Sequence, residues 1–192
     1  LTKRLIDIVV ASIGLMLTLP VMALVAGAIR LTSKGDVLYH QRRVGLQGRI
    51  FVLHKFRSMR EDAETETGPV WASKQGDDRV TPLGSLLRRT RFDELPQLWN
   101  VLRGDMSFVG PRPERPEFVS ELTKQIPFYR QRHVLRPGLT GWAQVRYTYG
   151  ASVEDALQKL QYDLFYIKHM SVSLDLFIIF STIKTVILRK GA

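Results

Sequence analysis

Two adjacent acidic residues, Asp93 and Glu94, follow an arginine-rich stretch and are the side chains of this chain best suited to catalysis. Arg88, Arg89 and Arg91 precede them, and these cations would offset the repulsion between the two carboxylates. Arginine binds phosphate oxygens through paired hydrogen bonds, and a carboxylate pair can hold a divalent ion that shares those oxygens. A site that only binds anions gains nothing from two acids, so the segment favours metal-assisted phosphoryl transfer.

The elements around this acidic pair determine where its carboxylates stand. Residues 82–90 are predicted to form a short helix, and apolar residues recur at i, i+3, i+4 and i+7 from Leu95 in a second helix that ends at Gly104. Asp93 and Glu94 would start this second helix, where the helix dipole and exposed N–H groups favour anions. In the alternative interpretation, Asp93 is an ordinary helix cap and Glu94 a first-turn acid.

Arg112 is a further candidate phosphate ligand because it lies in the run Gly110-Pro111-Arg112-Pro113. The fixed φ angles of the flanking prolines would hold the direction of its side chain. An arginine in a solvated loop is the alternative interpretation, and the spacing alone does not decide between the two.

The composition excludes several other kinds of chemistry. The 192 residues include no cysteine, which rules out disulfides, cysteine-ligated zinc, iron–sulfur clusters and a thiol nucleophile. With 28 Lys and Arg against 18 Asp and Glu, the net charge is +10, which favours an anionic partner. Since no polybasic arm is present, nucleic acid is not expected as that partner. The histidines have no metal-ligand spacing and are assigned structural roles; they are His40, His54, His133 and His169.

A long apolar segment lies near the N-terminus, where residues 8–29 carry no charge. At about 1.5 Å per residue, a helix of this length crosses a bilayer. A signal peptide is the competing interpretation, but the run is too long and no small-residue cleavage pattern closes it. The segment therefore predicts membrane residence.

Pro20 stands in the middle of this segment and cannot donate an N–H to the carbonyl of Met16, so the helix should kink or break there. Lys and Arg flank both ends, and such residues favour the cytoplasmic side. A helix-break-helix that enters one leaflet and returns satisfies both ends, whereas the alternative is a single kinked span. We predict a re-entrant membrane hairpin over residues 1–34 and a catalytic domain over residues 35–192.

The catalytic domain is predicted to have a mixed α/β fold that is mostly helical. Residues 37–40 and 50–54 are β-prone runs joined by a glycine-containing turn, and the acidic residues 61–80 should form a solvated excursion. Helices are expected around residues 115–132 and 153–170.

The apolar C-terminal tail contains Asp175 and Lys184, which disfavours a transmembrane crossing. An interfacial amphipathic helix and an ordinary helix that packs on the core both fit this pattern.

Three long motifs resemble the bacterial sugar transferase family, the monotopic phosphoglycosyl transferases that start lipid-linked glycan assembly. These motifs are YHQRRVGLQGRIFVLHKFRSM, TPLGSLLRRTRFDELPQLWNVLRGDMSFVGPRP and RPGLTGWAQV. The similarity extends over almost the whole chain, and motifs of this length and order are far more specific than a short glycine pattern.

The resemblance implies transfer of a sugar 1-phosphate from a UDP-sugar to polyprenyl (undecaprenyl) phosphate, with release of UMP, as the first step of lipid-linked glycan or exopolysaccharide assembly. Asp93 would be the nucleophile that forms a phospho-aspartyl intermediate, and Asp93 with Glu94 would hold Mg²⁺. The resemblance also implies a monotopic protein of the bacterial inner membrane, with its catalytic domain on the cytoplasmic face and the lipid bilayer as a partner. A homo-oligomer is compatible with it.

Other residues match positions of the family with less defined roles. Arg88 and Arg112 match positions that resemble phosphate clamps, while Arg57 and Arg136 are assigned as supports or further anion contacts. Gln144 in GWAQV either helps to recognise the nucleotide or is a structural turn residue.

One feature departs from the family pattern. The hairpin of the family commonly breaks at Ser-Pro, whereas Leu19 precedes Pro20 here, so that position offers no hydroxyl to cap the freed carbonyl. A non-catalytic basic module that binds the membrane surface is the alternative function.

Overall fold

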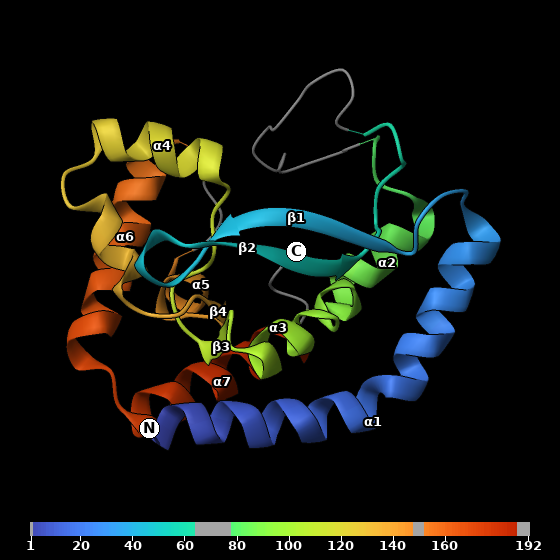
Figure 1. The fold of residues 1–192 in the computed structure, drawn as a ribbon, viewed down its shortest axis with the longest axis horizontal. Helices are drawn as coiled ribbons and strands as arrows, with labels where there is room; N and C mark the ends of the chain where they lie inside the picture. The colour runs from blue at the N-terminus through green and yellow to red at the C-terminus, as the bar shows by residue number, and fades with distance from the viewer. Residues whose placement is uncertain (1, 64–77, 148–151, 188–192) are drawn as a thin grey trace.

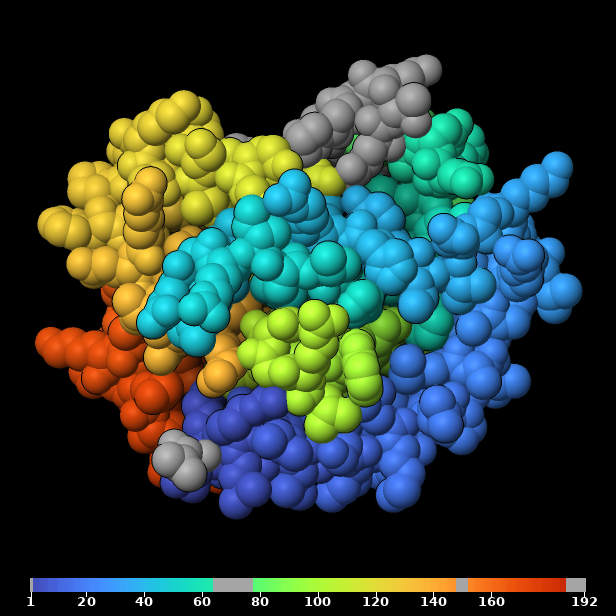
Figure 2. Space-filling model, in the orientation of Figure 1, coloured from blue at the N-terminus to red at the C-terminus, as the bar shows by residue number. Residues whose placement is uncertain are grey.

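The computed structural model describes residues 2–63, 78–147 and 152–187. A long helix, α1 (Thr2–Thr32), runs along one side of the molecule, and the hairpin of β1 (Leu38–Val44) and β2 (Ile50–Phe56) crosses above it (Figure 1). The helix α3 (Gln97–Arg103) lies between α1 and the hairpin and contacts both (Figure 2). The described residues form a mostly helical α/β fold, as the sequence predicts.

The α1 helix is continuous and contains Pro20. Its axis bends (Figure 1), so the predicted disruption is a bend and not an interruption of the helix. The hydroxyl of Thr18 donates to the carbonyl of Gly14 at 2.7 Å. Only 11% of the most apolar window of α1 is buried, although the helix is long and apolar enough to cross a membrane. This exposure distinguishes α1 from the core helix of a soluble protein.

One face of α1 is nevertheless tied to the rest of the fold. Ala11 is fully buried with Leu53 of β2, Val101 of α3 and Met106 in one apolar cluster. Asp7 is also buried, and its carboxylate accepts hydrogen bonds from the Ser107 hydroxyl at 3.0 Å and the Phe108 N–H at 3.1 Å. The N-terminal helix therefore shares a core with the domain that carries the acidic pair.

The antiparallel pairing of β1 with β2 confirms the predicted hairpin. A short 3-10 turn, η1 (Leu46–Gly48), joins the strands, and Gly48 adopts a positive φ of 78° that glycine accommodates without strain. Side chains alternate between the faces, which places Leu53 in the core and Lys55 on the same side of the sheet.

The acidic pair does not start an α-helix, contrary to the prediction. The first predicted helix is α2 (Pro82–Thr90), but Asp93 and Glu94 lie in a 3-10 turn, η2 (Phe92–Glu94), ahead of α3. Pro96 has no N–H to give to the carbonyl of Phe92, which accepts from Leu95 at 3.3 Å instead. The predicted end of the second helix at Gly104 is confirmed, since this residue forms a left-handed cap.

A second sheet was not predicted. It consists of two short parallel strands, β3 (Ser107–Val109) and β4 (Gly138–Thr140). Glycines allow these segments to meet, since a Cβ at Gly138 would lie 2.2 Å from the nitrogen of Gly110, and one at Gly141 would lie 2.2 Å from its oxygen. The contact joins the GPRP motif to the RPGLTGW motif.

The remaining helical elements complete the fold. They are α4 (Pro116–Gln125), the 3-10 turn η3 (Tyr129–Val134), α5 (Trp142–Arg146), α6 (Val153–His169) and α7 (Val172–Ile187). The helix predicted over residues 115–132 is thus divided at Phe128, which has a φ of 61°, and the helix predicted over 153–170 is confirmed. The predicted excursion at 61–80 falls largely on residues 64–77, which lie outside the described residues.

The C-terminal helix α7 packs on the core through one face. Ile178 is fully buried with Val109 and Tyr166, whereas Phe177 and Phe180 are exposed. Lys3 of α1 forms an ion pair with Asp175 at the start of α7, which links the two apolar helices.

Candidate active site

The two carboxylates of the acidic pair have different surroundings. Glu94 Oε1 is surrounded by cations, with Arg112 Nη2 at 3.0 Å, Lys55 Nζ at 3.4 Å and Arg91 Nη1 at 3.7 Å. Asp93 is 7% exposed, and its buried Oδ1 has no hydrogen-bond partner within the part of the chain that the structure describes. Glu94 Oε1 is therefore engaged by protein cations, while Asp93 keeps an oxygen available for chemistry.

The pKa values of the pair shift in opposite directions. Burial and the neighbouring Glu94 carboxylate raise the pKa of Asp93 above its ordinary value. Burial opposes the ionisation of Glu94 as well, but Lys55, Arg112 and Arg91 outweigh it and hold the pKa of Glu94 well below its usual range. Such divergence within an acidic pair is typical of sites where each carboxyl has a separate role. Glu94 is a fixed negative charge, and Asp93 is the more basic carboxylate.

Lys55 is a site residue that the motif analysis missed. It extends from β2 and contacts Glu94 from the strand side. Burial lowers the pKa of the Lys55 ammonium, and the Glu94 carboxylate opposes this shift. The available signal is strand alternation, because a lysine that shares a face with the core residue Leu53 needs an anionic partner.

Arg112 reaches the acidic pair, and its backbone is held from the other side. Arg132 donates from Nη2 to the Arg112 carbonyl at 3.0 Å and forms an ion pair with Asp163 at 2.8 Å. Arg132 and Asp163 are 5% and 1% exposed, respectively. The only local signal for this buried pair is that Asp163 falls on the buried stripe of α6, between Leu160 and Tyr166.

Arg88 and Arg57, two of the predicted anion contacts, have different neighbours. The Nε of Arg88 donates to the Ser58 hydroxyl at 2.9 Å, and its charge lowers the pKa of Asp93, which places Arg88 in the same electrostatic environment. Arg57 donates from Nη2 to the Ser33 hydroxyl at 2.8 Å, beyond the end of α1. Arg88 thus belongs with the acidic pair, while Arg57 holds the chain that leaves α1.

Arg136 and Gln144 are placed on the side of the second sheet. The Nε of Arg136 donates to the carbonyl of Gly104 at 2.9 Å, at the opposite end of α3 from the acidic pair. Gln144 donates from Nε2 to the carbonyl of Leu139 at 3.2 Å, and its buried Oε1 has no partner. Arg136 is engaged in capping α3, and Gln144 lies in the short helix α5, which follows β4.

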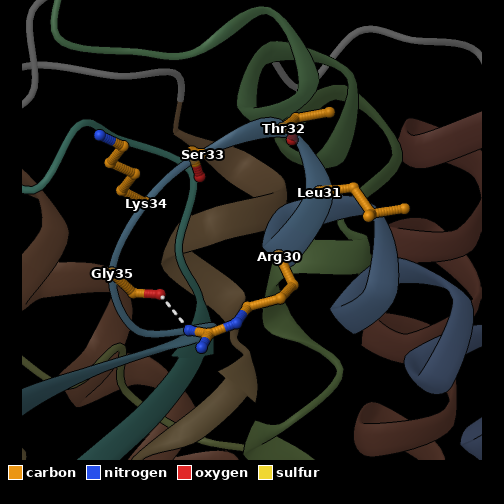
Figure 3. Close-up of a pocket in the computed structure, with 6 residues that line it drawn as sticks. All are labelled: Arg30, Leu31, Thr32, Ser33, Lys34 and Gly35. Atoms are coloured by element: carbon orange, nitrogen blue, oxygen red, sulfur yellow. Dashed lines mark hydrogen bonds between the residues drawn. The ribbon is translucent and has the colours of Figure 1, made fainter.

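A hollow at the end of α1 is separate from the acidic pair. Residues 30–35 line it, and Arg30 donates from Nη1 to the carbonyl of Gly35 at 3.3 Å (Figure 3). A second hollow, next to it, includes Arg57 and Thr81 in its wall. Both openings lie where the chain passes from the apolar helix to the hairpin.

The histidines do not form a metal centre with acidic residues. The hairpin places His40 opposite His54, with Nδ1 atoms 2.9 Å apart. Burial, followed by the charge of Arg132, lowers the pKa of His133 to about 4. Within residues 2–63, 78–147 and 152–187, no cluster of three or more His, Asp or Glu side chains is placed to hold a metal ion.

Comparison with known proteins identifies relatives of this chain. A family model described as Bacterial sugar transferase matches residues 1–189. A UDP-N-acetylgalactosamine-undecaprenyl-phosphate N-acetylgalactosaminephosphotransferase of Aeromonas hydrophila is 46% identical over 190 residues, which cover 99% of this chain and 44% of the relative.

Two further relatives are named UDP-glucose:undecaprenyl-phosphate glucose-1-phosphate transferase. The protein of Xanthomonas campestris pv. campestris is 45% identical over 192 residues, covering 99% of this chain and 40% of the relative. That of Escherichia coli (strain K12) is 40% identical over 194 residues, covering 100% of this chain and 41% of the relative. The chain therefore spans less than half the length of these three relatives.

Proposed function

Since the chain belongs to the bacterial sugar transferase family, we propose that it moves a sugar 1-phosphate from a UDP-sugar to undecaprenyl phosphate, the first step of lipid-linked glycan or exopolysaccharide assembly. The observation that carries this proposal is the buried Asp93 carboxylate, which has a raised pKa and an unpartnered oxygen beside the cation-bound Glu94. A module that only binds a membrane surface has no use for a buried, unpartnered acid among arginines.

The transfer proceeds in two displacements at one phosphorus atom. An Asp93 oxygen attacks the sugar-linked phosphorus of the UDP-sugar, and the bond from this phosphorus to the bridging oxygen breaks, so that UMP leaves with the electron pair. An oxygen of the lipid phosphate then attacks the phospho-aspartyl intermediate, which releases the Asp93 carboxylate and forms a polyprenyl diphosphate sugar. Because the lipid phosphate is already ionised, no strong base is required.

The cations around the acidic pair stabilise the negative charge on the phosphoryl oxygens during these steps. Arg88 and Arg112 would bind the oxygens of the transferring phosphoryl group; the contact of Arg112 with Glu94 and the charge of Arg88 near Asp93 support this role. Glu94 holds Lys55 and Arg112 in position by pairing with both of them. This pairing partly neutralises the two cations until the phosphate of a substrate binds.

Mg²⁺ fits the donor set of this site. The unpartnered Asp93 oxygen and the adjacent Glu94 carboxylate are hard oxygen ligands, and Mg²⁺ is commonly held by one or two carboxylates together with substrate phosphates. When bound, the ion supplies positive charge that neutralises the phosphoryl oxygens.

The decisive experiment for the function is release of UMP from purified protein given undecaprenyl phosphate, Mg²⁺ and one UDP-sugar at a time. UDP-glucose and UDP-N-acetylgalactosamine are the first donors to compare, because the relatives are named for them. We expect UMP to be formed with at least one donor, in equal amount to the polyprenyl diphosphate sugar. Tight membrane binding without UMP from any UDP-sugar would support the non-catalytic alternative.

The membrane part of the proposal is a re-entrant α1 that enters the inner membrane from the cytoplasmic face and returns to it. The bend of α1, its exposed apolar surface and the basic residues at both ends support this arrangement. The exposed apolar face of α7 would rest in the same interface.

Single cysteines can test this topology because the chain has no cysteine of its own. In inner-membrane vesicles, Thr2→Cys and Lys34→Cys should react from the cytoplasmic side with a maleimide that does not cross membranes. Leu19→Cys should be protected, although its side chain is 63% exposed on the protein surface, because lipid would cover it. Labelling of the two ends from opposite sides would instead establish a single span.

A further inference from the structure

Gln97 is a buried polar side chain whose amide nitrogen is unpaired among the described residues. It lies in the first turn of α3 and is 4% exposed. Its Nε2 is buried and has no hydrogen-bond partner. A buried donor without an acceptor destabilises a fold, so such groups commonly mark a place where a ligand supplies the missing partner.

The backbone places this amide about one helical turn from the nucleophile. Leu95 and Pro96 have right-handed helical angles, so the chain is helical from η2 into α3. The N–H of Leu98 donates to the carbonyl of Leu95 at 3.0 Å, a 3-10-type bond. At roughly three to four residues per turn, Asp93 and Gln97 lie about one turn apart along this stretch.

The two side chains are chemically complementary but do not satisfy each other. Asp93 Oδ1 lacks a donor and Gln97 Nε2 lacks an acceptor, and both atoms are buried. A single group that contacts both atoms must therefore offer an acceptor to the Gln97 amide and an electrophilic centre to the Asp93 carboxylate. A phosphoryl group does both, since its phosphorus is electrophilic and its outer oxygens accept hydrogen bonds.

We propose that the Gln97 side-chain amide binds an outer oxygen of the phosphoryl group that Asp93 receives. The inference rests on the proposed function and adds a neutral donor to the site. The surrounding arginines and Lys55 provide charge, whereas an amide held by its helix provides direction without a further buried charge. The hydrogen bond would be made in the transfer step and would stabilise the transition state more than the bound donor.

Asn100 provides a matched contrast on the same helix. It is fully buried, like Gln97, but its amide is used within the fold. Its Nδ2 donates to the carbonyl of Val52 at 2.8 Å, and its Oδ1 accepts from the N–H of His54 at 3.1 Å. Asn100 is thus a structural amide that fastens β2 to α3.

The test compares Gln97→Met with Asn100→Leu in the full chain, by UMP release and by thermal unfolding. Gln97→Met keeps the length of the side chain and removes the donor. We expect kcat to fall by about 10²–10³-fold, with a smaller change in the KM for the UDP-sugar. The Tm should stay equal or rise, because an unpaired buried donor is removed. Asn100→Leu should lower the Tm, because it leaves the backbone groups of Val52 and His54 unpaired.

Two results would overturn the inference about Gln97. One is a Gln97→Met protein that keeps kcat within a few-fold of wild type. The other is a drop in Tm as large as that of Asn100→Leu, which would make Gln97 structural. If the wild-type protein releases no UMP from any UDP-sugar, the proposed function itself fails, whatever Gln97 does.

Discussion

Asp93→Asn protein should release essentially no UMP, with a rate at least about 10⁴-fold below wild type, while it remains folded and bound to membranes. Asparagine has the shape of aspartate but cannot form the phospho-aspartyl bond. The substitution also removes a buried charge beside Glu94, so the Tm should be unchanged or higher. Glu117→Gln on α4 is the matched control, since Glu117 is exposed and its loss should leave UMP release unchanged.

A single-turnover measurement separates the covalent route from direct transfer. With a UDP-sugar but no lipid acceptor, wild-type protein should release up to one UMP per chain and retain a phosphosugar on Asp93, detectable by mass spectrometry. The Asp93→Asn protein should do neither. Sustained turnover by Asp93→Asn near the wild-type rate would exclude a covalent intermediate at this residue.

The raised pKa of Asp93 also predicts how this first step depends on pH. A protonated carboxyl cannot attack phosphorus, so the rate should fall as the pH is lowered. Because burial and Glu94 raise the pKa of Asp93, this loss should begin at a higher pH than the titration of an exposed aspartate. Glu94 should stay ionised throughout, since its cations lower its pKa.

The largest effect on stability is expected at the buried pair of Arg132 and Asp163. Arg132→Leu should reduce the free energy of unfolding by about 3–5 kcal/mol, because it leaves the Asp163 carboxylate buried without a partner. It should also lower UMP release, since Arg112 loses the hydrogen bond that holds its carbonyl. Denaturant unfolding in detergent measures the first effect, and steady-state kinetics the second.

The double variant Arg132→Leu/Asp163→Leu distinguishes the two effects. Replacement of both charges by apolar residues is often neutral or stabilising, so most of the lost stability should return. Activity should remain low, because no donor reaches the Arg112 carbonyl. A single Arg132→Leu variant that loses less than about 1 kcal/mol would show that the ion pair is not structurally important.

Local signals in the sequence predicted the elements that carry the acidic pair. The proline at the start of α2, the glycine at the end of α3 and the β-prone run of β2 are short-range patterns, and the structure follows them. The 3-10 turn that holds Asp93 was missed because the missing N–H of Pro96 changes the hydrogen bonding ahead of it. Here one residue type overrides the general preference for acids at a helix start.

Other features depend on contacts between distant segments, which a single sequence does not reveal. The strands β3 and β4 have three residues each, so they show no usable periodicity, and they pair across about thirty positions of the chain. Arg57 and Arg136 share the residue type of the proposed phosphate ligands, but they donate to Ser33 and to the Gly104 carbonyl. Residue type identified the class of partner, and tertiary packing decided which arginines face the acidic pair.

The hydrogen bonds from α1 to α3 couple the position of Asp93 to that of the apolar helix. Arg4 donates to the carbonyls of Val101 and Leu102 at 2.6 and 2.7 Å, so the apolar helix holds the far end of the short helix that begins just after Asp93. With α1 embedded in lipid as proposed, the Asp93 carboxylate would stay at a constant distance from the acyl chains. A change in bilayer thickness that shifts α1 would then shift Asp93 by the same amount.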